Sequence, residues 1–62
     1  MKVEYYPERC RKNIRKLMCL LTTDAQTAYS MMLLTAAMTD LKPEDDKVVE
    51  LILDDCDLEV RA

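Results

Sequence analysis

The chain of 62 residues contains no glycine and no histidine. Without glycine, it lacks the Asn-Gly and Asp-Gly turns typical of β-hairpins and the central glycine of a calcium-binding EF-hand loop. Without histidine, a zinc site would need cysteines, but the chain has no CxxC pair and its three thiols leave a tetrahedral site one ligand short. We therefore expect a helical protein that holds no metal and no other cofactor.

The three cysteines, Cys10, Cys19 and Cys56, are a poor basis for disulfides because their number is odd and their spacing wide. The N-terminus, MKVEYYPERCRKN, is charged from the start and has no apolar signal-peptide core. No apolar run reaches the roughly 18 residues of a membrane span. We therefore expect a cytoplasmic protein that binds no membrane, with reduced thiols that serve as small buried groups rather than nucleophiles.

The first predicted helix covers residues 7–22. Pro7 suits the first turn of a helix, where its missing N–H group would have no partner. Apolar side chains then recur at i, i+4, i+7, i+8 and i+11, which is the spacing of one helical face. These positions are Cys10, Ile14, Leu17, Met18 and Leu21. The other side of this helix is basic and carries Arg9, Lys12 and Lys16, flanked by Arg11 and Arg15.

The second predicted helix covers residues 24–39, where Thr23 and Gln26 form a capping-box pattern at its start. Its apolar residues surround the helix instead of forming one stripe. One face holds Ala25, Ala28, Tyr29, Met32 and Ala36, with Leu33 at its edge. A second face holds Met31, Leu34 and Met38, with Leu41 at its border. A helix that is apolar on all sides is buried on all sides, but two amphipathic helices cover only one side well.

The third predicted helix covers residues 43–57. Pro43 suits its first turn, and the acidic Glu44 and Asp45 favour the positive end of the helix dipole. The segment VVELIL has strand propensity, but the apolar stripe continues over three turns, which favours a helix. This stripe consists of Val49, Ile52, Leu53, Cys56 and Val60, with Val48 alongside. An acidic stripe lies on the other side and consists of Asp46, Glu50, Asp54 and Asp57.

These segments predict one all-α domain over residues 1–62. Its core is expected to contain Cys10, Ile14, Leu17, Leu21, Tyr29, Met32, Leu33, Ala36, Val49, Ile52, Leu53 and Cys56. A chain of this size buries only about 60 % of the surface that its unfolded form exposes, so small domains often need a disulfide, a metal or a second subunit. We therefore predict a homodimer in which the second helix packs against its own copy across a twofold axis. The predicted interface consists of Met31, Leu34, Met38 and Leu41.

Charge is segregated along the chain. Residues 1–16 carry six basic and two acidic side chains, a net charge of +4, whereas residues 40–62 carry nine acidic and three basic ones, a net charge of −6. The basic face of Arg9, Lys12, Arg15 and Lys16 is a candidate for binding phosphate groups, although such a face is often only solvated or paired with acidic neighbours. The net charge of the chain, −3, opposes nonspecific binding to nucleic acid.

The acidic stripe of Asp46, Glu50, Asp54 and Asp57 has two interpretations. It is an ordinary exposed helix face, or it imitates a phosphate backbone and occupies a basic groove of another protein, as small inhibitors from phages and mobile elements do. The carboxylates show no recognised metal-ligand spacing, and no histidine is present for acid–base work. The sequence therefore predicts no enzyme and no small-molecule substrate.

The predicted function is a non-catalytic protein–protein interaction module that regulates or inhibits a partner protein. Two features favour it: the surplus apolar face of the second helix and the segregation of charge. Methionine is common at adaptable binding surfaces, which adds to the first argument. The alternative is a small nucleic-acid-binding regulator that uses the basic face of the first helix.

Overall fold

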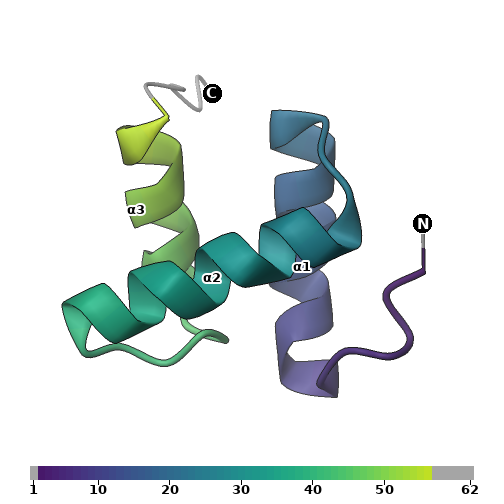
Figure 1. Cartoon of the computed structure of the whole chain (residues 1–62), viewed down its shortest axis with the longest axis horizontal. Helices are drawn as coiled ribbons and strands as arrows, with labels where there is room; N and C mark the ends of the chain where they lie inside the picture. Colours follow the sequence, from purple (N-terminus) through teal and green to yellow (C-terminus); the bar gives the residue numbers. More distant parts are fainter. Residues whose placement is uncertain (1, 57–62) are drawn as a thin grey trace.

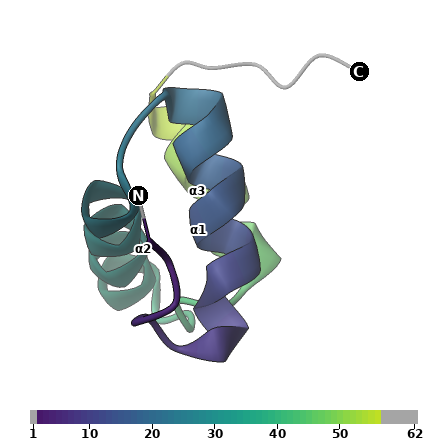
Figure 2. The same ribbon diagram turned by 90° about the vertical axis from the view of Figure 1, so that its right-hand side faces the viewer.

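In a computed structural model that describes residues 2–56, the chain forms three α-helices and the described part contains no strand. The helices are α1 (Glu8–Leu21), α2 (Ala25–Thr39) and α3 (Asp46–Asp55). α2 lies across α1 and α3, which stand side by side behind it (Figure 1). A view from the side shows α2 as one layer and the other two helices as a second layer (Figure 2). The predicted all-α architecture is therefore confirmed for the described residues.

α1 begins just after Pro7, which has an extended backbone (ψ 135°) and is the N-cap. Thr22 is the C-cap after the last residue of α1; its backbone is left-handed (φ 53°), and its N–H group donates to the carbonyl of Met18. Glycine usually occupies such a position, because a Cβ atom is crowded in this conformation. The buried face of α1 is the predicted stripe with one polar addition: Cys10, Asn13, Ile14 and Leu17.

The N-cap of α2 is Asp24, and not Thr23 of the predicted capping box of Thr23 and Gln26. The Asp24 carboxylate accepts a hydrogen bond from the backbone N–H of Thr27 at 2.8 Å. A carboxylate serves this position well because it also interacts favourably with the positive helix end. Asp40 is the C-cap after the last residue of α2 and again has a left-handed backbone (φ 59°).

The inner face of α2 consists largely of alanine. Its buried residues are Ala25, Ala28, Met32 and Ala36. Small side chains at a contact shorten the distance between helix axes. α2 therefore lies close to both other helices and has more extensive contact with each of them than they have with each other.

α3 begins at Asp46, three residues later than predicted. Pro43 and Glu44 form a turn, in which the Asp45 N–H donates to the carbonyl of Lys42 at 2.9 Å. The buried amide of Asn13 on α1 reaches this turn, because its Nδ2 lies 3.1 Å from the carbonyl oxygen of Glu44 and 3.4 Å from that of Asp45. These hydrogen bonds hold the turn against α1. The predicted stripe residues Val60 and Asp57 lie outside the described residues.

Most of the predicted core is confirmed. The predicted residues that are buried are Cys10, Ile14, Leu17, Met32, Ala36, Val49, Ile52 and Leu53. Leu21 and Tyr29 are partly buried and pack against this core. Leu33 and Cys56 were predicted wrongly and are exposed, because Leu33 lies on the side of α2 away from the core and Cys56 comes after the last residue of α3.

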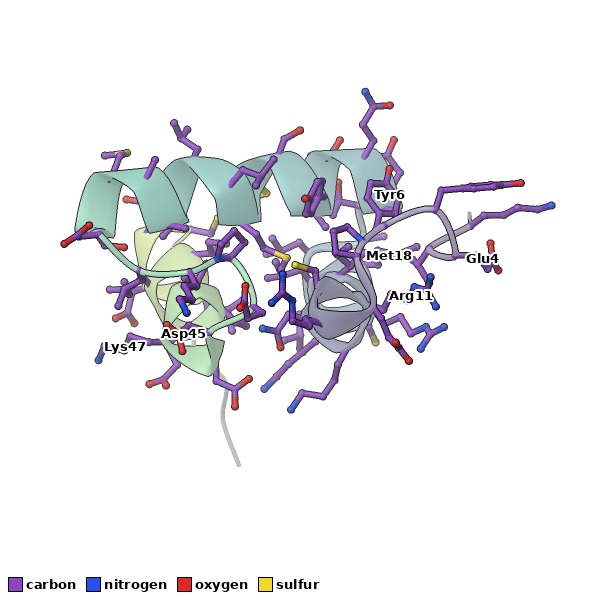
Figure 3. All side chains as sticks on the ribbon, turned by 90° about the horizontal axis from the view of Figure 1, so that it is seen from below. Glu4, Tyr6, Arg11, Met18, Asp45 and Lys47 are labelled. Carbon is purple, nitrogen blue, oxygen red and sulfur yellow. The ribbon has the colours of Figure 1, made fainter. Side chains whose placement is uncertain are left out.

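The segment before α1 also contributes to packing. Val3 is buried in the core, and the ring of Tyr6 lies 5.0 Å from that of Tyr29 on α2. The Arg11 guanidinium donates to the carbonyl of Tyr6 at 3.1 Å and to that of Glu4 at 2.6 Å (Figure 3). Arg11 thus holds the N-terminal segment in place.

The Asp24 cap generates a prediction for stability. Hydrogen bonds from Thr27 hold the pKa of the Asp24 carboxyl below its ordinary value of 3.8. The stabilisation is therefore fully present above the ordinary pKa and is lost as the pH falls through the lower pKa of the folded state. Asp24→Ala should lower the melting temperature by a few degrees at pH 7 and by less at pH 3.

Thermal unfolding followed by circular dichroism at the two pH values measures this effect. Asp24→Asn is the matched control, because asparagine keeps an oxygen acceptor at the N-cap but has no carboxyl to titrate. At pH 7 the melting temperature of Asp24→Asn should be close to that of the unsubstituted chain. A difference between the unsubstituted chain and Asp24→Ala that stays the same at both pH values would contradict the account.

Candidate functional site

The outer face of α2 carries a cluster of exposed apolar side chains. Leu33 is 42 % exposed, Leu34 64 % and Met38 77 %, and Ala37 between them is also exposed. At 100° per residue these positions share the side of the helix opposite Met32. We call them the outer α2 patch: Leu33, Leu34, Ala37 and Met38. Figure 3 shows a row of side chains that project from α2 on the side away from α1 and α3.

The helix that carries the outer α2 patch has no charged side chain. From Ala25 to Thr39 the sequence has no Asp, Glu, Lys or Arg. α1 and α3, by contrast, both carry charged residues on their solvent-facing sides. Scattered exposed apolar residues are ordinary, but a contiguous apolar patch marks an interaction surface.

A shallow groove adjoins the outer α2 patch on the side of α3. It consists of two neighbouring hollows of about 220 and 240 Å³, which share Leu34, Thr35 and Asp55. We call them together the α2–α3 groove. The remaining lining residues are Met31, Met38 and Thr39 from α2 and Leu51, Ile52 and Cys56 from α3 and its end. Each hollow is smaller than a typical small-molecule pocket, which has about 300–1,000 Å³, but it can receive apolar side chains.

The structure divides the predicted interface into two pairs. Leu34 and Met38 are exposed, whereas Met31 and Leu41 are partly buried and pack against the core. Met31 still lines the groove. Leu33 belongs to the outer α2 patch and was missed, because its position between the two predicted faces of the helix placed it with the core. Its helical angle, which is close to that of Ala37, was the signal that could have identified it.

The basic face of α1 is partly paired with acidic residues. The Nη1 atom of Arg9 lies 3.9 Å from Oε2 of Glu44, and the Nζ atom of Lys12 lies 3.7 Å from Oδ1 of Asp46. Exposed pairs of this kind contribute only about 0–1 kcal/mol each to stability. The remaining predicted residues of this face, Arg15 and Lys16, are exposed further along the same helix. The structure therefore places acidic side chains beside one end of the predicted phosphate-binding face.

The acidic stripe is also divided. Asp46 forms the pair with Lys12, while Glu50 and Asp54 are exposed on α3. Asp57, the fourth predicted member, lies outside the described residues. Two members of the stripe thus remain on the described surface without contributing to either hollow of the α2–α3 groove.

The cysteines differ from one another in burial. Cys10 is buried, as predicted, but Cys19 and Cys56 are exposed, and all three are free thiols. Burial raises the pKa of the Cys10 thiol, Glu44 raises it further, and Arg9 lowers it in part. A thiol with a raised pKa is protonated at neutral pH and is a poor nucleophile. Within residues 2–56, no three Cys, Asp or Glu side chains are grouped closely enough to hold a metal ion.

No protein-family model, curated protein sequence or solved structure matches this chain. Among the described helices, none combines the length and the apolar character needed to cross a bilayer. The features of the described residues that bear on function are the outer α2 patch, the α2–α3 groove and the charged faces of α1 and α3.

Proposed function

We propose that this chain is a non-catalytic protein–protein interaction module that acts as a homodimer and regulates or inhibits another protein. The observation that carries the proposal is the outer α2 patch, in which Leu34 and Met38 are largely exposed to water. Covering apolar surface is favourable by about 25 cal/mol per Å². A 62-residue chain has little apolar surface to spare, so the exposure of these side chains favours a role in association.

A second copy of the chain is a suitable cover for this surface. A twofold axis places the same residues of both copies against each other, and α2 has no charged side chain that would be repelled. Four side chains expose far less than the roughly 800 Å² per partner that a standard interface buries. The interface therefore also needs the α2–α3 groove, which lies directly beside Leu34 and Met38.

The charged faces are the candidates for contact with the regulated partner. If α2 faces the second copy, the outer sides of α1 and α3 remain accessible. They offer basic Arg15 and Lys16 and acidic Glu50 and Asp54, all exposed. The dimer presents each face twice, which increases the avidity for a partner that has two matching sites.

Charged substitutions in the outer α2 patch test the homodimer. Leu34→Glu combined with Met38→Glu should convert the dimer into a folded monomer, because four carboxylates would have to be desolvated at the interface. These positions suit the test better than Met31, which packs against the core. Light scattering on a sizing column measures the mass, and circular dichroism measures whether the helices persist.

Leu20→Glu is the matched control, because Leu20 is also an exposed leucine but lies on α1. It should leave the mass of the dimer unchanged. A double variant that keeps the mass of the unsubstituted chain and remains folded would exclude the outer α2 patch as the interface.

The alternative function is nucleic-acid binding through Arg9, Lys12, Arg15 and Lys16. Glu44 and Asp46 lie beside the first two of these residues and weaken the positive potential there. We expect no specific binding of duplex DNA, only a weak interaction at low salt that disappears by about 0.15 M. Fluorescence anisotropy with labelled duplexes at two salt concentrations measures it. Tight binding that Arg15→Glu with Lys16→Glu abolishes would favour the alternative function.

A further inference from the structure

The α2–α3 groove joins an uncharged wall to an acidic one. Leu34, Met38 and Thr39 of α2 line one side of it, and α2 has no charged side chain. Asp55, the last residue of α3, lines both hollows, and it alone is charged among the described residues that line them. Asp55 is exposed, so a ligand in the groove can reach its carboxylate. The groove therefore combines apolar surface with one accessible negative charge.

The negative charge continues beyond the groove. Residues 40–56, which contain α3 and the turn before it, carry seven acidic and two basic side chains, a net charge of −5. Glu50 and Asp54 are exposed on α3, and no ion pair joins them or Asp55 to another described residue. A surface of this sign attracts basic ligands and repels anionic ones, such as the phosphate groups of nucleic acid or of a membrane.

The carboxylate of Asp55 distinguishes between two kinds of occupant. The helix α2 of a second copy would bring apolar side chains but no cation, because Ala25–Thr39 contains no lysine and no arginine. A helix with apolar and basic residues on one face would bring both. Its apolar side chains suit the two hollows, and its basic side chain suits Asp55, which belongs to the wall that the hollows share. Because complementary charges favour one partner over another, the groove favours a basic segment.

We propose that the α2–α3 groove binds a basic amphipathic helix of the regulated partner protein, whose lysine or arginine pairs with Asp55. Two apolar side chains on the same face of that helix enter the two hollows, as in other complexes in which a helix lies in a groove. This inference rests on the proposed role as an interaction module and names the chemistry of its partner. Because Leu34 and Met38 belong both to the groove and to the outer α2 patch, the partner helix displaces a second copy.

Two designed peptides test the inference. The first is a capped helical peptide of about 18 residues, rich in alanine and glutamine, with two leucines four residues apart and one lysine on the same face. The second has glutamate in place of that lysine. The unsubstituted chain should bind the lysine peptide about tenfold more tightly, because an exposed ion pair contributes up to about fivefold and the glutamate adds repulsion. Fluorescence anisotropy of the labelled peptides measures both dissociation constants.

The variants Asp55→Lys and Asp54→Lys locate the contact. Both change the net charge of the chain equally, and both place a cation near the negative end of α3, which favours the helix. Asp54 lines neither hollow. Asp55→Lys should reverse the preference, so that the glutamate peptide binds more tightly than the lysine peptide. Asp54→Lys should keep the preference for lysine within about threefold of that of the unsubstituted chain. Circular dichroism verifies that both variants are folded.

Each contrary result overturns the inference. Equal binding of the two peptides by the unsubstituted chain would mean that the groove accepts apolar side chains without regard to charge. A reversal by Asp54→Lys as complete as that by Asp55→Lys would assign the effect to α3 as a whole and not to the groove. If neither peptide binds, a basic helix is not the occupant. Light scattering on the peptide-free chain tests the homodimer separately, so the homodimer can stand where this inference fails.

Discussion

The structure depends on α2, which is apolar on every side and which, within residues 2–56, has only α1 and α3 to cover it. Ala25, Ala28, Met32 and Ala36 form the inner face of α2 and are buried in the core of the domain. The opposite face carries Leu33, Leu34 and Met38, and in the described residues no other helix lies over it. The described helices form two layers, with α2 in one and α1 and α3 in the other, so α2 has one buried side and one open side (Figure 2).

A second constraint is the absence of glycine, which affects how the helices are connected. Both connections use a residue with a left-handed backbone, Thr22 after α1 and Asp40 after α2. Aspartate tolerates this conformation, but threonine is β-branched and is strained there. Asn13 stabilises the second connection by donating from α1 to the carbonyls of Glu44 and Asp45. The side-chain amide oxygen of Asn13, Oδ1, is buried and has no hydrogen-bond partner among the described residues, so the contact has a cost in desolvation.

The sequence predicted the three helices well, because the 3.6-residue period of Ile14 and Leu17, or of Val49 and Ile52, is set by local geometry. The features that it did not predict depend on tertiary contacts. α3 begins at Asp46 instead of Pro43, because Pro43 and Glu44 form a turn. Asn13 of α1, which is far away in the sequence, donates a hydrogen bond to the carbonyl of Glu44 in this turn. The helical period alone leaves Leu33 between the core and the surface. Its exposure follows from the way α2 lies across α1 and α3. The homodimer and the function remain predictions, because periodicity identifies an apolar face but not what covers it.

The central claim is that a second copy of the chain covers the outer face of α2. The most direct test is the solution mass of the unsubstituted chain, measured by light scattering on a sizing column in reducing buffer over a range of micromolar concentrations. The account predicts a mass that rises with concentration towards twice the 7.2 kDa of one chain. A well-folded monomer at every concentration would contradict it and would leave the outer α2 patch open to a different partner.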